Sequence, residues 1–385
     1  MPQPTNTDAR ARLSERLQAQ QQAGLKRQRR LTLAPLEDSG SQAFMNFASN
    51  DYLGLAHSKV MAQALADAAL ELGSGSGASP LVSGYHPAHR DLERALCQLT
   101  GYSQAILFCS GFAANQCLMS ALGDSLDYFV ADKLVHASII DGMRATKAKL
   151  KRFAHNDLLH ARKLAEGLEG QGAVVCESLY SMDGDTAPLA ELQQLAHSRG
   201  DLFIVDDAHG FGVLGATGFG ASELCRPDCL VVTFGKAMGC QGAAILADGP
   251  LIDYLQNFGR HYVYSTALSP AMAQAAITAL EQIEMGRRRE QLLANLELFK
   301  RNAKALNLPL MDSDSPIQPL LCGESDKALQ LATKLRERGI LVGAIRPPTV
   351  PAGSARLRIT IGARHSAEQI QSLTDALAEV LDELR

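Results

Sequence analysis

The sequence predicts an α/β protein whose large domain is a doubly wound, mainly parallel sheet, preceded by a helical arm and followed by a smaller α+β domain. Short apolar runs alternate mainly with helical patterns from residue 101 onward, as expected when a helix follows each buried strand. After a long helical stretch over residues 271–306, the pattern changes to a few strands mixed with helices. With 385 residues, the chain is also long enough for two hydrophobic cores.

The first part of the chain predicts an arm over residues 1–45. Within it, residues 8–30 are typical of an amphipathic helix, because Leu13 and Leu17 are one helical turn apart. The stretch ends in a basic run, which the dipole of a helix favours at its C-terminus and which solvent would also accommodate.

The large domain is predicted over residues 46–285 and the small domain over residues 286–385. A helix over residues 59–72 precedes a glycine-rich segment that on composition alone is a flexible linker, but that also permits close approach of the backbone to a ligand. Buried strands of the large domain are expected near residues 105–109, 128–131, 173–177, 202–206, 229–234 and 243–247. The small domain is expected to hold strands near 317–321, 340–345 and 356–361 and helices near 326–337 and 367–384.

Composition argues against several classes of protein. The formal net charge is −4, which gives no reason to expect nucleic acid as a partner. No apolar run reaches the roughly 18 residues of a membrane helix, and the polar start is unlike a signal peptide, so we expect a cytoplasmic protein. The eight cysteines are scattered without a C-x-x-C pair, so we expect reduced core residues and no metal site.

Chemically useful side chains follow two of the predicted strands. Lys236 follows an apolar strand and stands among small residues, where partial desolvation can turn its amine into a nucleophile. A solvated lysine at a strand end is the simpler interpretation of that residue alone. A second apolar strand ends in Asp206, Asp207 and His209, and ligands of parallel α/β sheets bind at the carboxyl ends of strands. An acid, a histidine and a lysine at one sheet edge suit pyridoxal 5'-phosphate, which needs a Schiff-base lysine and a carboxylate for its ring nitrogen.

Other interpretations of this region remain open. The segment from Gly210 to Gly215 has the form G-x-G-x-x-G, so a nicotinamide-dependent oxidoreductase is the second hypothesis. That fingerprint also requires a helix to begin at the glycine turn, whereas residues 216–220 form helices poorly, which argues against this hypothesis. A protein that binds the cofactor without catalysis is a third. Asp206 and Asp207 compete for the ring nitrogen, because neighbouring strand residues point to opposite faces and only one can address the ring.

The stretch Val205-Asp206-Asp207-Ala208-His209-Gly210, followed by Thr233-Phe234-Gly235-Lys236, resembles the α-oxoamine synthases, a family of fold-type I pyridoxal-phosphate transferases. The resemblance extends from about residue 45 to the C-terminus. It implies an acyltransferase that condenses an amino acid with an acyl thioester and releases carbon dioxide, through an aldimine on Lys236 and a quinonoid carbanion. It also implies a homodimer with shared active sites. The chain looks most like the biotin-pathway branch, which implies L-alanine and pimeloyl-CoA, or a pimeloyl carrier protein, as substrates, although sister activities with glycine or serine stay open.

The resemblance also assigns the residues that contact the cofactor. Asp206 would bond the ring nitrogen, His209 and Ser181 the ring hydroxyl, and His136 would cover the ring and help to polarise the thioester carbonyl, while Lys236 would act as the general base. The residues expected at the phosphate lie where strands end or helices begin; they are Ser110, Gly111, Phe112 and Thr233, with Ser265 and Thr266 contributed by a partner subunit. A Ser-Gly turn into a helix is itself a ready phosphate site, whereas the Ser-Thr pair alone would be a helix cap.

Substrate contacts are expected from three further regions. Arg356 and Arg358 share one face of a predicted strand, where they are either exposed arginines or able to bind a carboxylate through the guanidinium fork. The resemblance favours Arg358 for the carboxylate of the amino acid. It adds four residues near the substrates, namely Asn50, which is otherwise a turn former, Arg346, Thr349 and, from the arm, Arg27.

Overall fold

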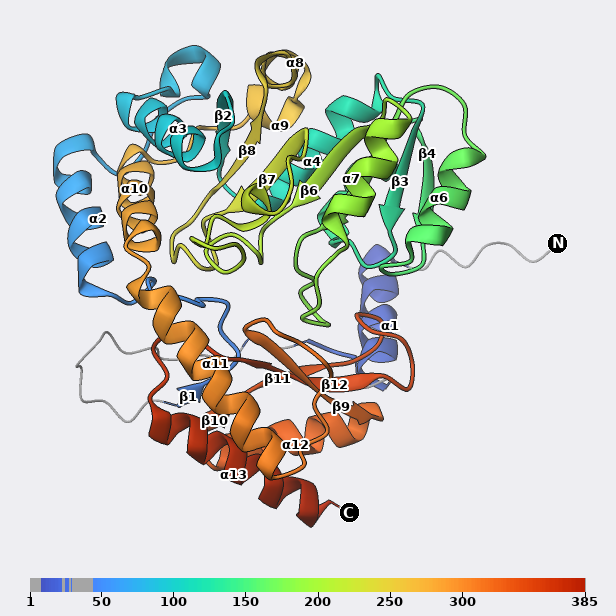
Figure 1. Ribbon diagram of the computed structural model, residues 1–385, viewed down its shortest axis with the longest axis vertical. Helices are drawn as coiled ribbons and strands as arrows, with labels where there is room; N and C mark the ends of the chain where they lie inside the picture. The colour runs from blue at the N-terminus through green and yellow to red at the C-terminus, as the bar shows by residue number, and fades with distance from the viewer. Residues whose placement is uncertain (1–7, 23–24, 28, 30–43, 385) are drawn as a thin grey trace.

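The computed structural model describes residues 8–22, 25–27, 29 and 44–384, and its large domain is built on a seven-stranded sheet (Figure 1). The strand order is β2-β8-β7-β6-β5-β3-β4. Their bounds are β2 Gln104–Phe108, β3 Tyr128–Asp132, β4 Lys149–Phe153, β5 Gly172–Glu177, β6 Leu202–Asp206, β7 Cys229–Thr233 and β8 Ala243–Ala247. Only β8 runs antiparallel to its neighbours β2 and β7, so the prediction of a mainly parallel sheet is confirmed.

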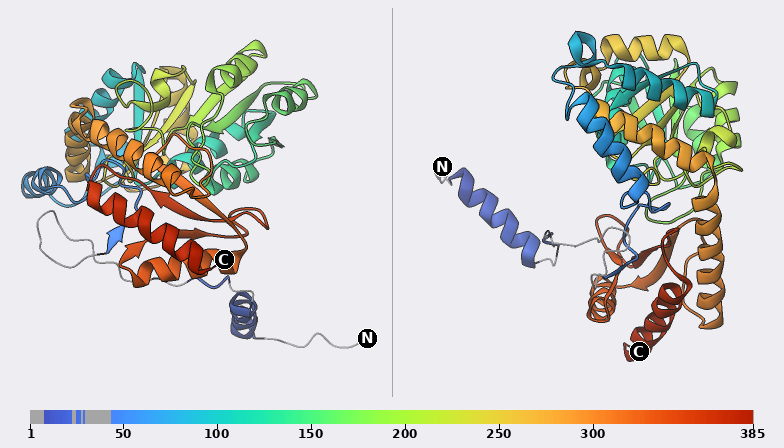
Figure 2. Two further views of the ribbon diagram at one scale, coloured as in Figure 1. Left: turned by 60° about the horizontal axis from the view of Figure 1, so that its bottom comes forward. Right: turned by 90° about the vertical axis from the view of Figure 1, so that its left-hand side faces the viewer.

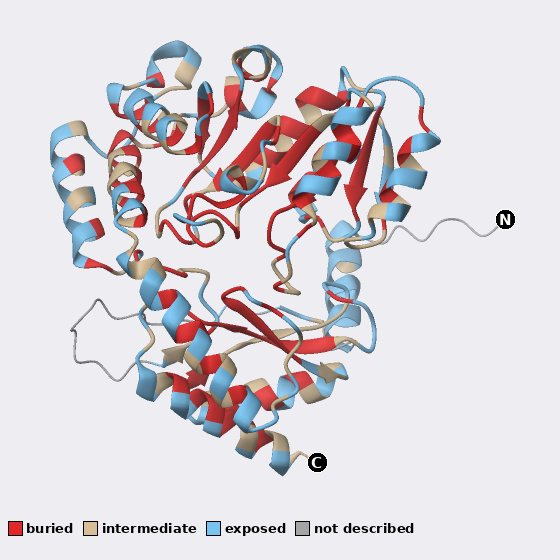
Figure 3. Cartoon of the chain, viewed as in Figure 1, coloured by how far each residue is buried: buried red, intermediate tan, exposed pale blue. Residues whose placement is uncertain are grey.

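Helices cover both faces of this sheet, and each face has its own core. In β5, Val174 and Cys176 point into one hydrophobic cluster, whereas Ala173 and Val175 point into the other. The first cluster is closed by α2 Lys59–Leu72, α3 Pro87–Thr100, α6 Leu158–Glu166, α7 Leu189–Ser198 and α10 Pro270–Glu284. The second is closed by α4 Gly111–Gly123, α5 Ala137–Arg144 and α8 Gly249–Phe258. The central strands are therefore buried on both sides, as Figure 3 shows.

Three short helices complete the large domain: the π-helix η1 Pro80–Gly84, the 3-10 helix η2 Gly220–Glu223 and α9 Arg260–Val263. Two features of residues 101–306 differ from the sequence expectations. The strand β4 was not expected, because it lies at the sheet edge and its lysines and arginine hide the apolar alternation. The single long helix expected over residues 271–306 is two helices, α10 and α11 Arg287–Ala305, because Gly286 adopts a left-handed conformation with φ 74° between them.

The small domain has a three-stranded antiparallel sheet in the order β11-β12-β9, with bounds β9 Ile317–Gly323, β11 Gly343–Ile345 and β12 Ala355–Thr360. The helices α11, α12 Ser325–Glu337 and α13 Ala367–Glu383 contribute to its core. The short strand β1 Met45–Asn46 lies far from the small domain in sequence but pairs in parallel with its strand β10 Ile340–Leu341. The neighbouring Phe47 is buried in the core of the small domain.

The N-terminal helix α1 Ala9–Gln22 stands away from both domains (Figure 2). It has no buried residue, and its two leucines, Leu13 and Leu17, are 62% and 58% exposed. The helix is shorter than expected; of the remaining residues 23–30, four lie outside the described part of the chain. Among the helices that the structure describes, none has the length and apolar character to cross a membrane.

Candidate active site

The candidate site forms where the carboxyl ends of β5, β6 and β7 meet. Glu177 and Asp206 are the last residues of β5 and β6 and are paired in register, and Thr233 ends β7. Lys236 follows Thr233 by three residues in a tight turn. The parallel arrangement thus brings two carboxyl groups, a hydroxyl and an amine to one edge, as the sequence predicted for Asp206, Thr233 and Lys236.

Burial determines the charge state of this lysine. It lowers the pKa of Lys236 to about 8, although the charges of Asp206 and Glu177 act in the opposite direction. Burial also raises the pKa of Glu177 well above its usual range, and the charge of Asp206 adds to this effect. An amine with a pKa near 8 releases its proton close to neutral pH, which a nucleophile or a general base requires.

The two adjacent acids at the end of β6 have different partners. Asp207 is fully buried and accepts hydrogen bonds from the hydroxyl of Ser178 and from the N–H of Ala221, the latter at 2.9 Å. Asp206 accepts from the Nδ2 of Asn115 at 2.7 Å, and its charge acts on Lys236. Asp207 is therefore held by groups of the protein interior, whereas the charge of Asp206 acts on the lysine.

His209 connects the large domain to the small one. Its Nδ1 lies 2.6 Å from the hydroxyl of Tyr52, and the Nη2 of Arg358 lies 3.5 Å from the same hydroxyl. Arg358 also donates from Nε to the carbonyl of Ser181 at 2.6 Å and from Nη1 to Thr360 at 3.1 Å. The guanidinium of Arg358 is thus held at the junction of the domains, beside two of the predicted site residues.

Arg356 and Arg358 are both buried, so the interpretation as exposed strand arginines is wrong. The Nη1 of Arg356 lies 2.6 Å from a carboxylate oxygen of Asp183. Arg356 is therefore already paired with an acid of the protein, which leaves Arg358 as the better candidate for a substrate carboxylate.

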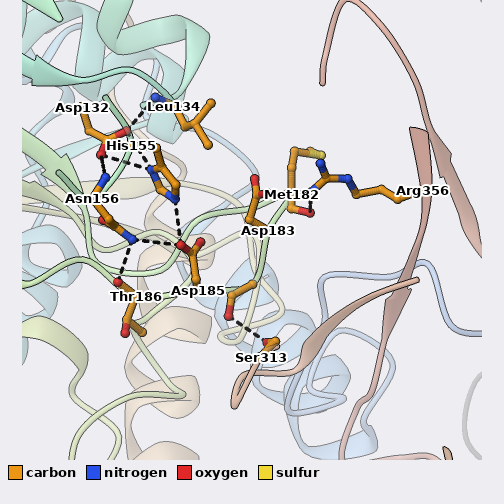
Figure 4. A network of polar contacts seen from close by, with 11 residues as sticks. Asp132, Leu134, His155, Asn156, Met182, Asp183, Asp185, Thr186, Ser313 and Arg356 are labelled. Atoms are coloured by element: carbon orange, nitrogen blue, oxygen red, sulfur yellow. Dashed lines mark hydrogen bonds and ion pairs between the residues drawn. The ribbon is translucent and has the colours of Figure 1, made fainter. Parts of the chain in front are cut away.

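The loop that carries Ser181 is fixed by a network of charged and polar groups (Figure 4). His155 bonds Asp132 at 3.0 Å through Nδ1 and Asp185 at 2.7 Å through Nε2. Asn156 donates to Asp185 at 2.9 Å, and the hydroxyl of Ser313 in the small domain donates to the carbonyl of Gly184 at 2.8 Å. The loop is thereby tied both to the end of β3 and to the small domain.

The phosphate site is predicted at the start of α4. Ser110 caps the helix, accepting from the N–H of Ala113 at 3.2 Å, and the first N–H groups of any helix have no partner within it. A Cβ at Gly111 would lie 3.4 Å from the Oγ1 of Thr233, so a glycine keeps the helix start close to this hydroxyl. A helix N-terminus, a hydroxyl, a partly desolvated lysine and a carboxylate are the donor and acceptor set that pyridoxal phosphate requires, and the residues present fit it.

His136 is the residue before α5 and lies close to Phe112 at the start of α4. Its Nδ1 is 2.7 Å from the hydroxyl of Ser138, and that hydroxyl accepts from the Nδ2 of Asn115 at 3.1 Å. Phe112 approaches the imidazole edge-to-face, with ring centroids 6.3 Å apart. Through Ser138 and Asn115, the ring of His136 is connected to the carboxylate of Asp206.

The remaining predicted residues occupy different surroundings. Ser265 and Thr266 line a pocket with Cys109 and Ala113 of the same chain, beside the start of α4, and their contribution to a partner's site stays a prediction. The Oδ1 of Asn50 is buried without a hydrogen-bond partner among the described residues, and its contact with a substrate stays a prediction. The other three substrate contacts also stay predictions; Thr349 and the arm residue Arg27 are exposed, and Arg346 is half-buried.

Sequence reasoning missed three residues of this site, namely Tyr52, Asn115 and Glu177. Asn115 is a buried polar residue within an apolar helix, and Glu177 is a carboxylate at the end of a fully apolar strand; both patterns were available as signals. Tyr52 gave no such signal, because tyrosine is common in cores.

Comparison with known proteins identifies the family. Residues 42–377 match the family described as aminotransferase class I and II. A curated 8-amino-7-oxononanoate synthase from Vibrio parahaemolyticus serotype O3:K6 (strain RIMD 2210633) is 46% identical over 382 residues, which cover 97% of this chain and 99% of that protein. The chain belongs to the 8-amino-7-oxononanoate synthase family. Another member, from Klebsiella pneumoniae (strain 342), is 49% identical over 89% of this chain and 90% of its own.

The fold of the family is shared more widely. A serine palmitoyltransferase from S. paucimobilis, solved with a PLP–myriocin aldimine, has a TM-score of 0.88 and 27% identity, covering 98% of this chain and 99% of its own. The predictions of a fold-type I enzyme, of an acyltransferase and of pyridoxal phosphate as cofactor are confirmed by membership of the 8-amino-7-oxononanoate synthase family.

Proposed function

We propose that this chain condenses L-alanine with a pimeloyl thioester, carried by CoA or by a carrier protein, in biotin synthesis. The products are 8-amino-7-oxononanoate, carbon dioxide and the free thiol of CoA or of the carrier protein. The observation that carries the proposal is the placement of Lys236 beside Asp206 with Arg358 held close by, in a chain 46% identical to a curated 8-amino-7-oxononanoate synthase. These groups offer a base, a ring-nitrogen partner and a carboxylate receptor in one place.

When bound, pyridoxal phosphate supplies an electron sink for the carbon next to the amine of the substrate. Asp206 would hold its ring nitrogen, His209 its ring oxygen, and the start of α4 with Thr233 its phosphate. Lys236 would anchor the cofactor and then accept the Cα proton of alanine at Nζ, as its pKa near 8 permits at physiological pH.

The small domain would orient the substrate. Arg358 is held by Ser181 and Thr360, so its guanidinium loses little conformational freedom when it binds the alanine carboxylate. His136, which is exposed at the start of α5, would polarise the thioester carbonyl. Arg27, Asn50, Arg346 and Thr349 would contact the substrates in the roles that the resemblance gives them.

We further propose a cytoplasmic homodimer. Val82 in the middle of η1 and Tyr264 directly after α9 are 80% and 75% exposed, and these two elements pack together beside Ser265 and Thr266. Exposed apolar side chains next to a site are typical of an interface between subunits.

A product assay tests the reaction. We expect kcat/KM with pimeloyl-CoA to be higher for L-alanine than for glycine by roughly 10- to 200-fold, the discrimination that one methyl group provides in an apolar pocket. Serine, other acyl-CoAs and a pimeloyl carrier protein complete the comparison. Preference for glycine with acetyl-CoA or succinyl-CoA would contradict the proposed substrate pair.

The carboxylate receptor can be tested with matched variants. Arg358→Lys should raise KM for L-alanine, because the bidentate fork is lost. Arg356→Lys is the control, since Arg356 is paired with Asp183, and it should leave this KM nearly unchanged. Equal effects of the two substitutions on KM would argue against the role of Arg358.

A further inference from the structure

Tyr52 occupies a position between the two domains that its sequence context did not indicate. It is fully buried in the segment that follows β1, and its hydroxyl lies 2.6 Å from Nδ1 of His209 and 3.5 Å from Nη2 of Arg358. Its two partners come from the turn that follows β6 in the large domain and from β12 in the small domain.

The chemistry of the three groups fixes the direction of both hydrogen bonds. A guanidinium has donors and no acceptor, so Arg358 donates to the oxygen of Tyr52. The single hydroxyl hydrogen of Tyr52 is then directed to His209, whose Nδ1 must accept it. With the opposite polarity, a proton on Nδ1 would leave the hydroxyl hydrogen without an acceptor among the described residues, in a buried place where such groups are rarely unpaired.

The charge state of His209 agrees with this assignment. Burial lowers the pKa of His209 well below its usual range, and the positive charges of Lys236, Arg358 and His136 lower it further. The imidazole is therefore neutral at pH 7 and carries one proton. Burial also raises the pKa of Tyr52 to about 12, so the hydroxyl keeps its hydrogen.

We propose that Tyr52 is a positioning residue that fixes His209 in the tautomer with its proton on Nε2. The imidazole then presents an N–H donor on the side away from Tyr52, which suits an oxygen of the cofactor ring. This inference rests on the proposed function for the role of His209, but the tautomer itself is a property of the chain.

The tautomer can be measured without substrate, so its outcome is independent of the proposed reaction. Long-range proton–nitrogen correlation spectra of the full chain labelled with ¹⁵N-histidine, with and without pyridoxal phosphate, report which ring nitrogen is protonated; His209→Gln assigns the signal. We expect an unprotonated Nδ1 and a protonated Nε2 in both forms. A proton on Nδ1 of the cofactor-free wild-type chain would overturn the proposal.

Two tyrosine variants separate positioning from packing. Tyr52→Phe removes the donor and should populate both tautomers, lowering kcat about 3- to 10-fold, the range expected from one hydrogen bond. We expect KM for L-alanine to change less, because Arg358 keeps Ser181 and Thr360. Tyr180→Phe is the control, since Tyr180 is also buried and its hydroxyl makes no side-chain hydrogen bond among the described residues.

Tyr180→Phe should leave the tautomer and kcat unchanged. The proposal is refuted if Tyr52→Phe retains the Nε2–H tautomer alone, or if Tyr180→Phe lowers kcat as much as Tyr52→Phe does. Thermal unfolding of both variants checks their folding, and the wild-type spectrum decides the tautomer even if Tyr52→Phe does not fold.

Discussion

Replacing His155 by glutamine should destabilise the protein by an amount that depends on pH. His155 bridges Asp132 and Asp185, whose side chains are 0% and 34% exposed, and its own side chain is 23% exposed. His155→Gln removes the positive charge that Asp132 and Asp185 share, and the carboxylate of Asp132 is fully buried. Breaking a fully buried pair costs about 3–5 kcal/mol and an exposed pair contributes at most about 1 kcal/mol, so we expect a loss of about 2–3 kcal/mol at pH 6 for this partly buried bridge.

The sign of the pH dependence follows from the pKa of His155. Partial burial lowers this pKa, but the hydrogen bonds and charges of Asp132 and Asp185 outweigh burial and raise it to about 10. A histidine whose pKa is raised in the folded state contributes stability that is fully present below its unfolded pKa of about 6.5 and is lost as pH rises towards 10. The difference between wild type and His155→Gln should therefore shrink between pH 6 and pH 10.

Urea unfolding followed by circular dichroism measures this difference at pH 6, 8 and 10, with cofactor and chain concentrations held equal. His197→Gln is the matched control, because His197 also bonds an aspartate, Asp228, at 2.9 Å but is 44% exposed. It should cost less than about 1 kcal/mol. A pH-independent difference for His155→Gln, or one no larger than that of His197→Gln, would refute this account of the network.

Three further outcomes are expected. Lys236→Ala should abolish turnover but still bind pyridoxal phosphate non-covalently, and borohydride reduction with peptide mapping should label Lys236 in the wild type; labelling of another lysine would contradict the site. Asp206→Asn should lose most of kcat with little change in unfolding temperature, whereas Asp207→Asn should mainly lower stability, by about 1–3 kcal/mol, because buried hydrogen bonds are lost. Mixing Lys236→Ala chains with Thr266→Ala chains should restore some activity if subunits share their sites, and proven heterodimers without activity would speak against sharing.

The sequence predicted best those helices and strands whose pattern of apolar and polar residues is set by burial. Buried strands such as β6 and β7 are apolar up to their last residue, and parallel pairing then places Asp206 and Lys236 at one edge. The edge strand β4 escaped prediction because solvent faces most of its side chains. The break at Gly286 escaped because a single glycine does not interrupt the helical periodicity on either side.

The periodicity of the sequence does not predict which distant segments of the chain contact each other. Tyr52 is 157 positions from His209 and 306 from Arg358, and no local pattern encodes such pairs. The choice between Asp206 and Asp207 likewise depended on partners from other elements, Asn115 for the first and Ser178 for the second. Local sequence patterns predicted which residues lie near the site. Only the tertiary structure shows which partners each of these side chains contacts.

The pairing of β1 with β10 has a consequence for the order in which the protein folds. Met45 pairs with Ile340, and Phe47 lies in the core of the small domain. The ribosome makes the first of these segments early in synthesis and the other near its end. A ribosome releases Phe47 long before its core partners Leu357 and Leu373, so we expect the segment to stay unpaired until the C-terminal part of the chain has been made. Closing so long a loop carries an entropic cost that only the finished small domain offsets, so we expect completion of the small domain to be a late step of folding.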